Sequence, residues 1–503
     1  MTTPWLEPLL DAPTMRATDQ WAIEQRGVPA RELMEHAGEA LARVAGEVVP
    51  AGRLAIVCGR GNNGGDGLVA ARILRAAGRD VDVRLTGPGA ELSADAAEQL
   101  ERLPGAAPAR FGPGGLDGAA GVVDALLGTG FRGAPREPLD GAIAAINAAG
   151  VPVVAADVPS GVDASSGEVA GVAVRAAATV AFHAAKPGLW IAPGKQHAGR
   201  VVVAGIGIPP GAPHRSSAGL ILDTVLTRLP HRGAESTKFT SGALVVVGGS
   251  SGLTGAPTMA AQAAQRAGAG YVTVAAPASL ELAFAARLLE VMFAGLPEHG
   301  GELGPDAIEA ALGRLQRASA AVLGPGLGRA AGARILAREL VARIDSPLVV
   351  DADGLNALGP DFAELLADRT APTVLTPHAG ELGRLLGLPA SEIETRRLRH
   401  ALEAARRSGA VVVLKGDDTL IASPDGRVAV SRGGAPGLAT AGTGDVLAGT
   451  IGALLARGAE LDLAVAAGVH AHVRAGRLAA AAHGPDAVIA SDVIAALPAA
   501  LAG

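Results

Sequence analysis

The sequence predicts an α/β protein built from two three-layer αβα domains. Short runs rich in Val, Ile and Ala alternate with longer stretches rich in Ala, Leu and Arg, which is the pattern of βα units around a largely parallel sheet. The chain has 503 residues, more than one ordinary core accommodates, so two domains are expected. Each domain should therefore carry its own parallel sheet.

The strand candidates fall into two series. The first series comprises the runs at 53–59, 80–85, 121–128, 152–158, 178–184 and 200–206. The second comprises 243–249, 271–277, 319–326, 347–353, 372–378 and 410–416, followed by a hairpin over 418–431 whose turn is Asp425-Gly426. A segment rich in Pro, Gly and Ser separates the two series, so we predict domains at 1–215 and 229–503 joined by a linker over 216–228.

The composition indicates a packed, soluble protein. Hydrophobic residues make up 49% of the chain and charged residues 18%, which disfavours disorder. The net charge of −6 gives no electrostatic reason to expect nucleic acid or an anionic membrane as a partner. The single cysteine, Cys58, rules out an internal disulfide and fits a reducing compartment. With no signal-peptide pattern and no long apolar run, we expect a cytoplasmic location.

Lysine is rare in this chain. Of 43 basic residues only four are lysines, namely Lys186, Lys195, Lys238 and Lys415. Where a chain otherwise uses Arg, a Lys suggests a place in which a planar guanidinium will not serve. Chance explains any single one of the four equally well.

The stretch "TAGTGDVLAGT" (440–450) joins a glycine loop to a helix-forming segment. Such loops bind phosphate oxygens on free N–H groups at a helix N-terminus. Asp445 stands at the join, where it could take a proton from a nucleophilic hydroxyl. Read alone, the loop fits a small-molecule kinase and equally any enzyme that borrows kinase chemistry.

In the first half, three strand ends carry unusual residues. "CGRGNNGGDG" (58–67) follows a strand and opens a helix, but its spacing is not that of the dinucleotide-binding fingerprint. The side-chain oxygens of Asn62 and Asn63 suit a weakly held cation or a sugar-phosphate. Asp124 and Asp157 end two further strands; each could simply cap a turn, but ligands bind beyond the carboxyl ends of parallel strands, so together they indicate a pocket.

The motifs "LMEHAG", "NNGGDG", "DALLGTG" and "DVPSGVDASSG", in this order over residues 33–167, resemble the NAD(P)H-hydrate epimerase family. The resemblance implies a Rossmann-like domain that interconverts the R and S epimers of NADH hydrate and NADPH hydrate. It assigns Asp157 as the candidate acid/base and a K⁺ ion to Asn63, Asp124 and Ser160. The substrate contacts it implies are Asn62, Asn63, Gly64, Gly65, Asp66, Gly128, Thr129, Gly130, Phe131, Arg132, Gly133, Ala134 and Asp157.

In the second half, "GPGLG" (324–328), "TPHAGE" (376–381) and "KGDDT" (415–419) each follow a predicted strand, and with the "GTGD" loop they resemble the ribokinase-like superfamily. Within it they look most like the ADP- or ATP-dependent NAD(P)H-hydrate dehydratases. The resemblance implies that the hydrate is bound by Ala256, Gly326, His378 and Asp445. It implies that the nucleotide is bound by Lys415, Gly416, Asp417, Asp418, Thr419 and Gly444, although Lys415 could also be an ordinary surface lysine.

The resemblance also explains how a kinase-like site can dehydrate. Hydroxide is a poor leaving group, so the hydroxyl is first phosphorylated, with Asp445 as the base and Mg²⁺ on the phosphate oxygens, and phosphate then departs. ADP is the implied donor and AMP and phosphate the products. The dehydratase acts on the S epimer, which gives a reason for its fusion to an epimerase. A homo-oligomer is expected, because domains of this type commonly assemble.

Two other hypotheses stay open at this point. The chain could be a kinase of a small hydroxylated precursor with an N-terminal regulatory domain, which predicts a stable phosphorylated product. Alternatively, the N-terminal half could be a binding module without activity, in which case replacing Asp157 would not affect epimer conversion.

Overall fold

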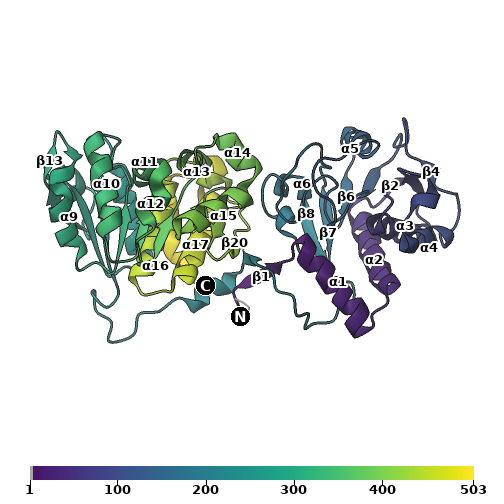
Figure 1. The fold of residues 1–503 in the computed structure, drawn as a ribbon, viewed down its shortest axis with the longest axis horizontal. Helices are drawn as coiled ribbons and strands as arrows, with labels where there is room; N and C mark the ends of the chain where they lie inside the picture. The colour runs from purple at the N-terminus through teal and green to yellow at the C-terminus, as the bar shows by residue number, and fades with distance from the viewer. Residues whose placement is uncertain (1–3, 503) are drawn as a thin grey trace. The chain divides into compact units, whose positions relative to one another are not determined.

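The computed structural model describes residues 4–502 and divides the chain into two compact units (Figure 1). The N-terminal unit is Pro8–Gly219, and the C-terminal unit is the chain from Leu220 onward together with the residues up to Glu7. Met1 to Thr3 and Gly503, where the predicted domains begin and end, lie outside the described residues. Each unit is a mainly parallel sheet covered by helices, so the predicted α/β class is confirmed.

The sheet of the N-terminal unit has the strand order β4-β3-β2-β5-β6-β7-β8, with parallel pairing throughout. Its strands are β2 (Leu54–Cys58), β3 (Val81–Leu85), β4 (Ala109–Arg110), β5 (Gly121–Ala125), β6 (Val153–Ala156), β7 (Ala178–Phe182) and β8 (Arg200–Ala204). The chain runs outward from β2 in one direction and from β5 in the other. The strand order therefore reverses between these two strands, and a ligand crevice is expected at their carboxyl ends.

Alternation along β2 sets the layers of this unit. Leu54, Ile56 and Cys58 share a buried cluster with side chains of two helices, whereas Ala55 and Val57 pack against a third helix on the opposite face, because successive side chains of a strand point to opposite sides (Figure 1). The first face is covered by α2 (Ala30–Val48) and α3 (Asn62–Ala76), and the second by α5 (Leu139–Ala148). The other helices are α1 (Ala12–Arg26), α4 (Ala94–Glu101) and α6 (Lys195–Ala198), with short 3₁₀ turns at Gly89–Glu91 and Pro187–Leu189.

The C-terminal unit is built on an 11-stranded sheet, in the order β1-β9-β20-β19-β18-β17-β16-β15-β10-β11-β12. Its strands are β1 (Leu6–Leu9), β9 (Ala218–Ile221), β10 (Ala243–Val247), β11 (Tyr271–Pro277), β12 (Met292–Leu296), β15 (Ala320–Leu323), β16 (Leu348–Val350), β17 (Thr373–Leu375), β18 (Val411–Leu414), β19 (Leu420–Ala422) and β20 (Val428–Val430); β13 (Glu298–His299) and β14 (Glu302–Leu303) form a separate pair. β19 and β20 are antiparallel, which confirms the predicted hairpin.

Helices α7 and α16 pack on each other and cover one face of this sheet, with α17 beside α16. The helices are α7 (Gly255–Arg266), α8 (Glu281–Ala285), α9 (Ile308–Leu315), α10 (Ala331–Arg343), α11 (Asp353–Leu358), α12 (Phe362–Leu366), α13 (Ala379–Leu386), α14 (Ala390–Thr395), α15 (Arg397–Ser408), α16 (Thr443–Ala456), α17 (Leu461–His483) and α18 (Ala490–Leu501). Five 3₁₀ turns lie at Ala278–Leu280, Pro305–Ala307, Gly359–Asp361, Pro436–Leu438 and Pro485–Ala487, and a sixth, η3, at Asp223–Arg228.

The segment 216–228, predicted as a linker, is structured. It carries β9 and η3, and Ile221, Val225 and Leu226 are buried in the main core of the C-terminal unit. The Pro- and Gly-rich stretch just before it suggests a flexible connection, but these apolar side chains are removed from water only when the segment packs on the sheet. Residues 220–228 of this segment are thus part of the C-terminal unit.

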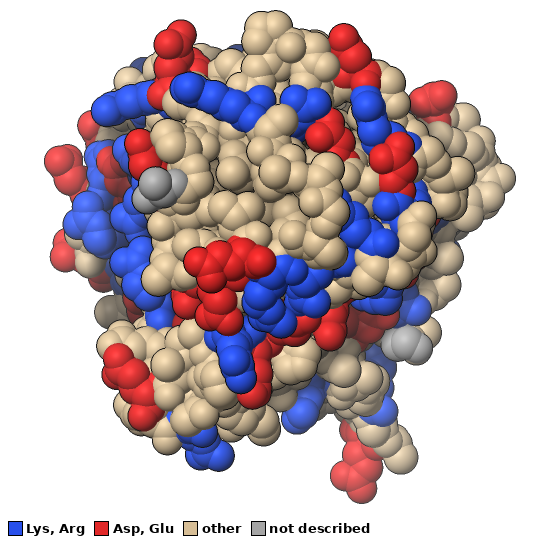
Figure 2. All heavy atoms as spheres, turned by 90° about the vertical axis from the view of Figure 1, so that its right-hand side faces the viewer, with Lys and Arg blue, Asp and Glu red and all other residues tan. Residues whose placement is uncertain are grey.

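On the face in Figure 2, basic and acidic side chains are interspersed. Within residues 4–502 no helix combines the length and the apolar character needed to cross a membrane.

Two candidate active sites

The N-terminal site is a cavity of about 1330 Å³ at the carboxyl ends of the strands of the first sheet. It brings together residues from α3, the loop after β5 and the ends of β6 and β7. Of the residues predicted to contact a substrate, its wall contains Asn62, Asn63, Asp66, Gly128, Thr129, Gly130, Phe131, Arg132, Ala134 and Asp157.

Three glycines that were predicted to contact the substrate are not in this wall. They instead allow close packing or a turn of the backbone. A Cβ on Gly64 would lie 2.1 Å from the carbonyl oxygen of Gly59, and one on Gly65 would lie 2.6 Å from the Met34 side chain. Gly64 therefore lets the start of α3 approach the end of β2, and Gly65 lets it approach α2. Gly133 has a φ of 83°, a conformation that side chains disfavour, so it serves the turn of its loop.

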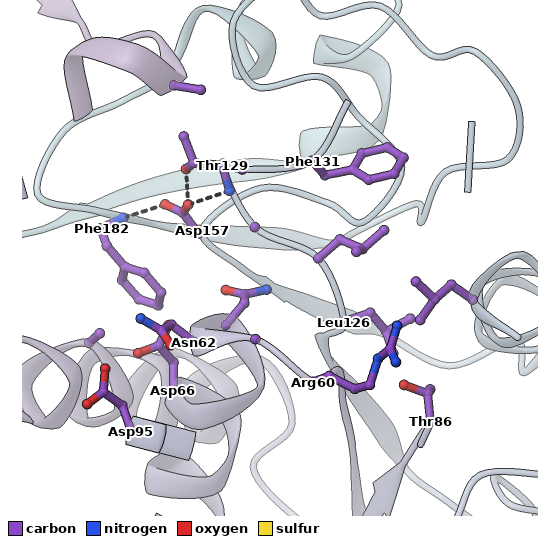
Figure 3. Close-up of a pocket in the computed structure, with 18 of the residues that line it drawn as sticks. Arg60, Asn62, Asp66, Thr86, Asp95, Leu126, Thr129, Phe131, Asp157 and Phe182 are labelled. Carbon is purple, nitrogen blue, oxygen red and sulfur yellow. Dashed lines mark hydrogen bonds between the residues drawn. The ribbon is translucent and has the colours of Figure 1, made fainter. Parts of the chain in front are cut away.

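Asp157 is held at four points in the cavity wall. Its carboxylate accepts hydrogen bonds from the backbone N–H of Thr129 (3.1 Å), from the backbone N–H of Phe182 (3.3 Å) and from the Thr129 hydroxyl (Figure 3). It also accepts a hydrogen bond from the Lys186 ammonium. Its φ of 65° is uncommon for a residue with a side chain. Burial would raise the pKa of Asp157, but the charge and hydrogen bond of Lys186, with those of Thr129 and Phe182, bring the pKa below its usual value.

Two further carboxylates share this cavity with Asp157 and Lys186. Asp66, on α3, has a pKa well above the usual value because of burial and the nearby charges of Asp157 and Asp19. Asp19, on α1, has its pKa raised to about 6 by burial and by Asp157, against the opposing influence of Lys186. Figure 3 shows Asp66 and Asn62 rising from α3 toward the part of the cavity that holds Asp157.

Asp124 and Ser160, two predicted metal ligands, are in contact. Asp124 accepts hydrogen bonds from the Ser160 hydroxyl (2.6 Å) and from the Ser160 N–H (2.8 Å), and burial raises its pKa to about 6. The Ser160 oxygen also accepts the N–H of Leu127 at 2.9 Å. Asn63 lies against Gly128 in the same loop region, and its Nδ2 is buried without a hydrogen-bond partner among the described residues.

The C-terminal site is formed by loops at the carboxyl ends of the second sheet. Gly326, after β15, has a φ of 62°, and a Cβ there would lie 2.3 Å from the Leu253 carbonyl oxygen and 3.2 Å from Pro257. The loop of Gly326 therefore packs directly on the start of α7, where Ala256 lies. A larger residue at position 326 would separate the two loops.

Lys415, after β18, is bound between two carboxylates. Its Nζ lies 2.9 Å from Asp351 Oδ1 and 3.5 Å from Glu381 Oε2. Asp351 also accepts the Thr376 hydroxyl at 2.8 Å. Burial would lower the pKa of Lys415, but Asp351 and Glu381 raise it above its usual value, so the ammonium stays charged.

His378 caps the start of α13. The ring Nδ1 of His378 accepts the backbone N–H of Gly380 (3.0 Å). The backbone N–H of His378 donates to the Glu381 carboxylate (2.9 Å). Burial lowers the pKa of His378, so the ring is neutral at pH 7. Its Nε2 then carries the ring proton and lies 3.6 Å from Glu381 Oε1.

Asp445 lies in the first turn of α16, whose N-cap residue Gly442 supplies no side-chain hydrogen bond. The first N–H groups of the helix are therefore available to an anion. A Cβ on Gly444 would lie 3.4 Å from Lys415 Nζ, so the ammonium stands beside this helix start. Burial, followed by the charge of Asp351, raises the pKa of Asp445 to about 7 despite the opposing influence of Lys415.

The segment 415–419 forms a turn stabilised by its own side chains. Asp418 is buried and forms an ion pair with Arg397 at 2.9 Å. Asp417 accepts the N–H of Gly434 at 2.6 Å, and the Thr419 hydroxyl donates to the Gly416 carbonyl at 2.7 Å. These side chains fix the turn, which leaves its backbone and Lys415 to meet a ligand.

Backbone strain coincides with both sites. Within the described residues, the non-glycine residues of positive φ are Asp157, His183 and Ala352, which follow β6, β7 and β16. Residues in this region are kept only where the surrounding structure enforces them, and such residues cluster at functional sites. Strain therefore supports the two sites independently of charge.

Sequence reasoning did not assign Asp19, Lys186, Asp351 or Glu381 to a site. The rarity of lysine was a signal for Lys186, and Glu381 lies inside the motif "TPHAGE", whereas Asp351 falls within the predicted strand 347–353. No signal in the sequence singles out Asp19 on α1.

Family models cover most of both units. One described as NAD(P)H-hydrate dehydratase matches residues 244–499, and one described as YjeF-related protein N-terminus matches residues 30–188. A crystal structure of the ADP/ATP-dependent NAD(P)H-hydrate dehydratase of Bacillus subtilis with ATP/Mg²⁺ is 30% identical, covering 55% of this chain and 94% of that one, with a TM-score of 0.48.

Similarity to named relatives extends over nearly the full length. The bifunctional NAD(P)H-hydrate repair enzyme of Salinibacter ruber is 40% identical over 98% of this chain and 95% of its own. The enzyme of the same name from Moorella thermoacetica is 41% identical over 97% of this chain and 96% of its own. The resemblance noted in the sequence is thus confirmed, and the chain belongs to the family of bifunctional NAD(P)H-hydrate repair enzymes.

Proposed function

We propose that this chain repairs hydrated nicotinamide cofactors with two activities. The N-terminal unit interconverts the R and S epimers of NADH hydrate and NADPH hydrate. The C-terminal unit dehydrates the S epimer to NADH or NADPH at the expense of ADP, releasing AMP and phosphate. The functional domains are residues 1–215 for the epimerase and 229–503 for the dehydratase.

One observation carries this proposal above the others: relatives named for this repair match 97% or more of the chain, and each unit has a charged site at its strand ends. A kinase with a regulatory domain gives no reason for a second cavity that contains Asp19, Asp66, Asp157 and Lys186. A binding module gives no reason for two carboxylates of opposite pKa shift in one cavity.

In the dehydratase, Asp445 takes the proton of the hydrate hydroxyl as the hydroxyl attacks the terminal phosphoryl group of the nucleotide. A pKa near 7 is suited to a base that must accept a proton and later release it. Lys415 and the N–H groups at the start of α16 bind the phosphate oxygens, and Ala256, Gly326 and His378 hold the hydrate. The backbone of 415–419 and Gly444 contact the nucleotide.

Mg²⁺ fits this site. Asp351 and Glu381 supply carboxylate oxygens beside the proposed phosphate position, and Mg²⁺ is commonly bound by one or two carboxylates together with substrate phosphates. When bound, it neutralises charge on the phosphate oxygens.

K⁺ fits the epimerase. A buried Asp124 carboxylate with no lysine or arginine partner among the described residues favours a cation, and Ser160 and Asn63 provide neutral oxygens nearby. Asn63, Asp124 and Ser160 would hold the ion, which would supply positive charge beside the buried carboxylate. We also propose that the protein is a homo-oligomer and that it is located in the cytoplasm.

The test supplies purified protein with mixed R and S NADH hydrate and ADP, then ATP, then neither nucleotide. Regain of NADH absorbance with a nucleotide, and conversion of all of the mixture rather than half, is the expected result. Failure to regenerate NADH with either nucleotide would disprove the dehydratase, and accumulation of a phosphorylated product would favour the kinase.

A further inference from the structure

We propose that Asp19 is the proton donor of the epimerisation and that Lys186 is the positioning residue that keeps Asp157 ready to receive a proton. The inference rests on the proposed epimerase function and adds two residues to it. Asp19 lies before the residues 30–188 that the N-terminal family model matches.

Asp19 faces the cavity with an unused hydrogen-bonding atom. It lines the cavity from α1, and its Oδ1 is buried with no hydrogen-bond partner among the described residues. Buried polar atoms are almost always paired, so an unpaired one beside a cavity indicates a ligand that pairs with it. A hydroxyl group of a substrate is such a partner.

Lys186 stabilises the negative charge of one carboxylate of the cavity more than that of the others. Its side chain is fully buried, and its Nζ binds the Asp157 carboxylate and, at 2.8 Å, the Phe182 carbonyl oxygen. One ammonium group cannot offset three buried negative charges at once. The direct contact assigns its charge to Asp157, so Asp157 is ionised, whereas Asp66 retains its proton and Asp19 retains its proton below about pH 6, in agreement with their pKa shifts.

Asp19 is better suited than Asp66 to give up that proton. Asp66 is almost fully buried on α3, whereas Asp19 is partly exposed and can exchange protons with water in the cavity. The charged groups that act on Asp19 are Asp66 from α3, Asp157 after β6 and Lys186 after β7, with Arg16 on its own helix also lining the cavity. The charge of Lys186 opposes protonation of Asp19, but Lys186 is bound to Asp157.

The chemistry of the substrate needs both an acid and a base. Water adds to an enamine so that the hydroxyl sits on the carbon bonded to the ring nitrogen. When Asp19 protonates this hydroxyl, the C–O bond breaks, its electron pair leaves on water, and the nitrogen lone pair forms a C=N bond. Water then attacks the opposite face of the planar cation, forming a new C–O bond and losing its proton to Asp157. The proton returns from Asp157 to Asp19 through cavity water, so nothing is consumed.

The experiment measures conversion of R-NADH hydrate to S-NADH hydrate by the full-length protein without nucleotide, by chromatography of the epimers and over a range of pH. Because Asp19 must be protonated, the wild-type kcat should fall as pH rises above about 6. Asp19→Asn should lower kcat about 100-fold or more and remove that fall. Lys186→Met should instead add a loss of kcat toward low pH, since Asp157 then gains a proton more readily, and Lys186→Arg should restore part of it.

Glu24→Gln, an exposed change on the same helix, is the matched control and should match the wild type. Thermal unfolding of each variant reports that the N-terminal unit is folded. A wild-type kcat that does not fall above pH 6, or an Asp19→Asn variant within threefold of wild type, would overturn the inference. If the wild type itself fails to convert the epimers, the proposed epimerase function fails and not this assignment alone.

Discussion

The N-terminal and C-terminal sites each place one of the four lysines beside buried carboxylates at strand ends, but they pair it differently. Lys186 contacts Asp157, the proposed proton acceptor of the epimerase. Lys415 contacts Asp351 and Glu381 and leaves Asp445, the proposed base of the dehydratase, without a direct ion pair among the described residues.

This difference sets opposite proton affinities in the two proposed bases. Lys186 lowers the pKa of Asp157, whereas burial and Asp351 raise that of Asp445 to about 7. In the first case the contact ion pair and the hydrogen bonds to Asp157 together outweigh burial, and in the second burial outweighs an ammonium that makes no ion pair with Asp445. Which carboxylate is charged therefore depends on which one the lysine contacts directly, and a lysine elsewhere in the site is not sufficient.

Asp445→Asn gives the largest expected separation of the two sites. The amide cannot accept the hydroxyl proton, so kcat for dehydration should fall by about 10²–10⁴-fold, while epimerisation continues unchanged. NADH regain from S-NADH hydrate and chromatography of the epimers measure the two activities. Asp486→Asn, at an exposed position, is the control; loss of epimerisation together with dehydration would mean that the sites are not independent.

Lys415→Met tests whether Lys415 binds the nucleotide phosphate and influences Asp445 without pairing with it. Loss of a hydrogen bond to a charged group costs about 1.5–3 kcal/mol, so the KM for the nucleotide should rise roughly 10- to 100-fold. Because Lys415 lowers the pKa of Asp445, the pH at which dehydration reaches its plateau should also move upward. An unchanged nucleotide KM would remove Lys415 from the phosphate site.

The pH dependence of the wild type compares the two bases directly. Asp445 acts in its deprotonated form, and its pKa is raised to about 7, so dehydration should be lost as pH falls through that value. The expected loss approaches tenfold per pH unit below it, as for a single titrating base. Asp157, with a lowered pKa, should cause no such loss in the epimerase at pH 6 to 7. Steady-state kcat at saturating substrate decides between these outcomes, and a flat dehydration profile would contradict the assignment of Asp445.

The glycines at the two helix starts should differ in their tolerance of a methyl group. In Gly64→Ala the new Cβ would lie 2.1 Å from a backbone oxygen, so overpacking should lower the free energy of unfolding by about 1–3 kcal/mol and impair epimerisation. In Gly444→Ala the nearest atom is 3.4 Å away, which is an ordinary contact, so we expect normal unfolding and an increase in nucleotide KM of a few-fold. Denaturant unfolding is the measurement. Gly46→Ala, inside α2 and with no atom within 4 Å of the new Cβ, controls for the effect of replacing a helical glycine by alanine.

Most of the fold could be predicted from the sequence, because buried parallel strands are continuous apolar runs. All twelve predicted parallel strands are present; β11 has the predicted bounds, and the others are shorter at one or both ends where the chain turns into loops. The missed strands, such as β4 and β9, are short and contain Gly, Ala or Arg, so no apolar run marks them. They form because a neighbouring strand offers unpaired hydrogen bonds, which is a non-local cause.

The sequence by itself determined the α/β class, the loops that follow the strands, and the residues Asp157, Lys415 and Asp445 as candidates for chemistry. Local pattern was sufficient there, because glycine loops and polar strand ends lie next to each other along the chain. Only the tertiary structure decided that Asp19 from α1 shares a cavity with Asp157, and that Lys186 binds one aspartate while Lys415 binds another. Burial and the distances between charges determine proton affinity, and both arise only when distant segments pack together.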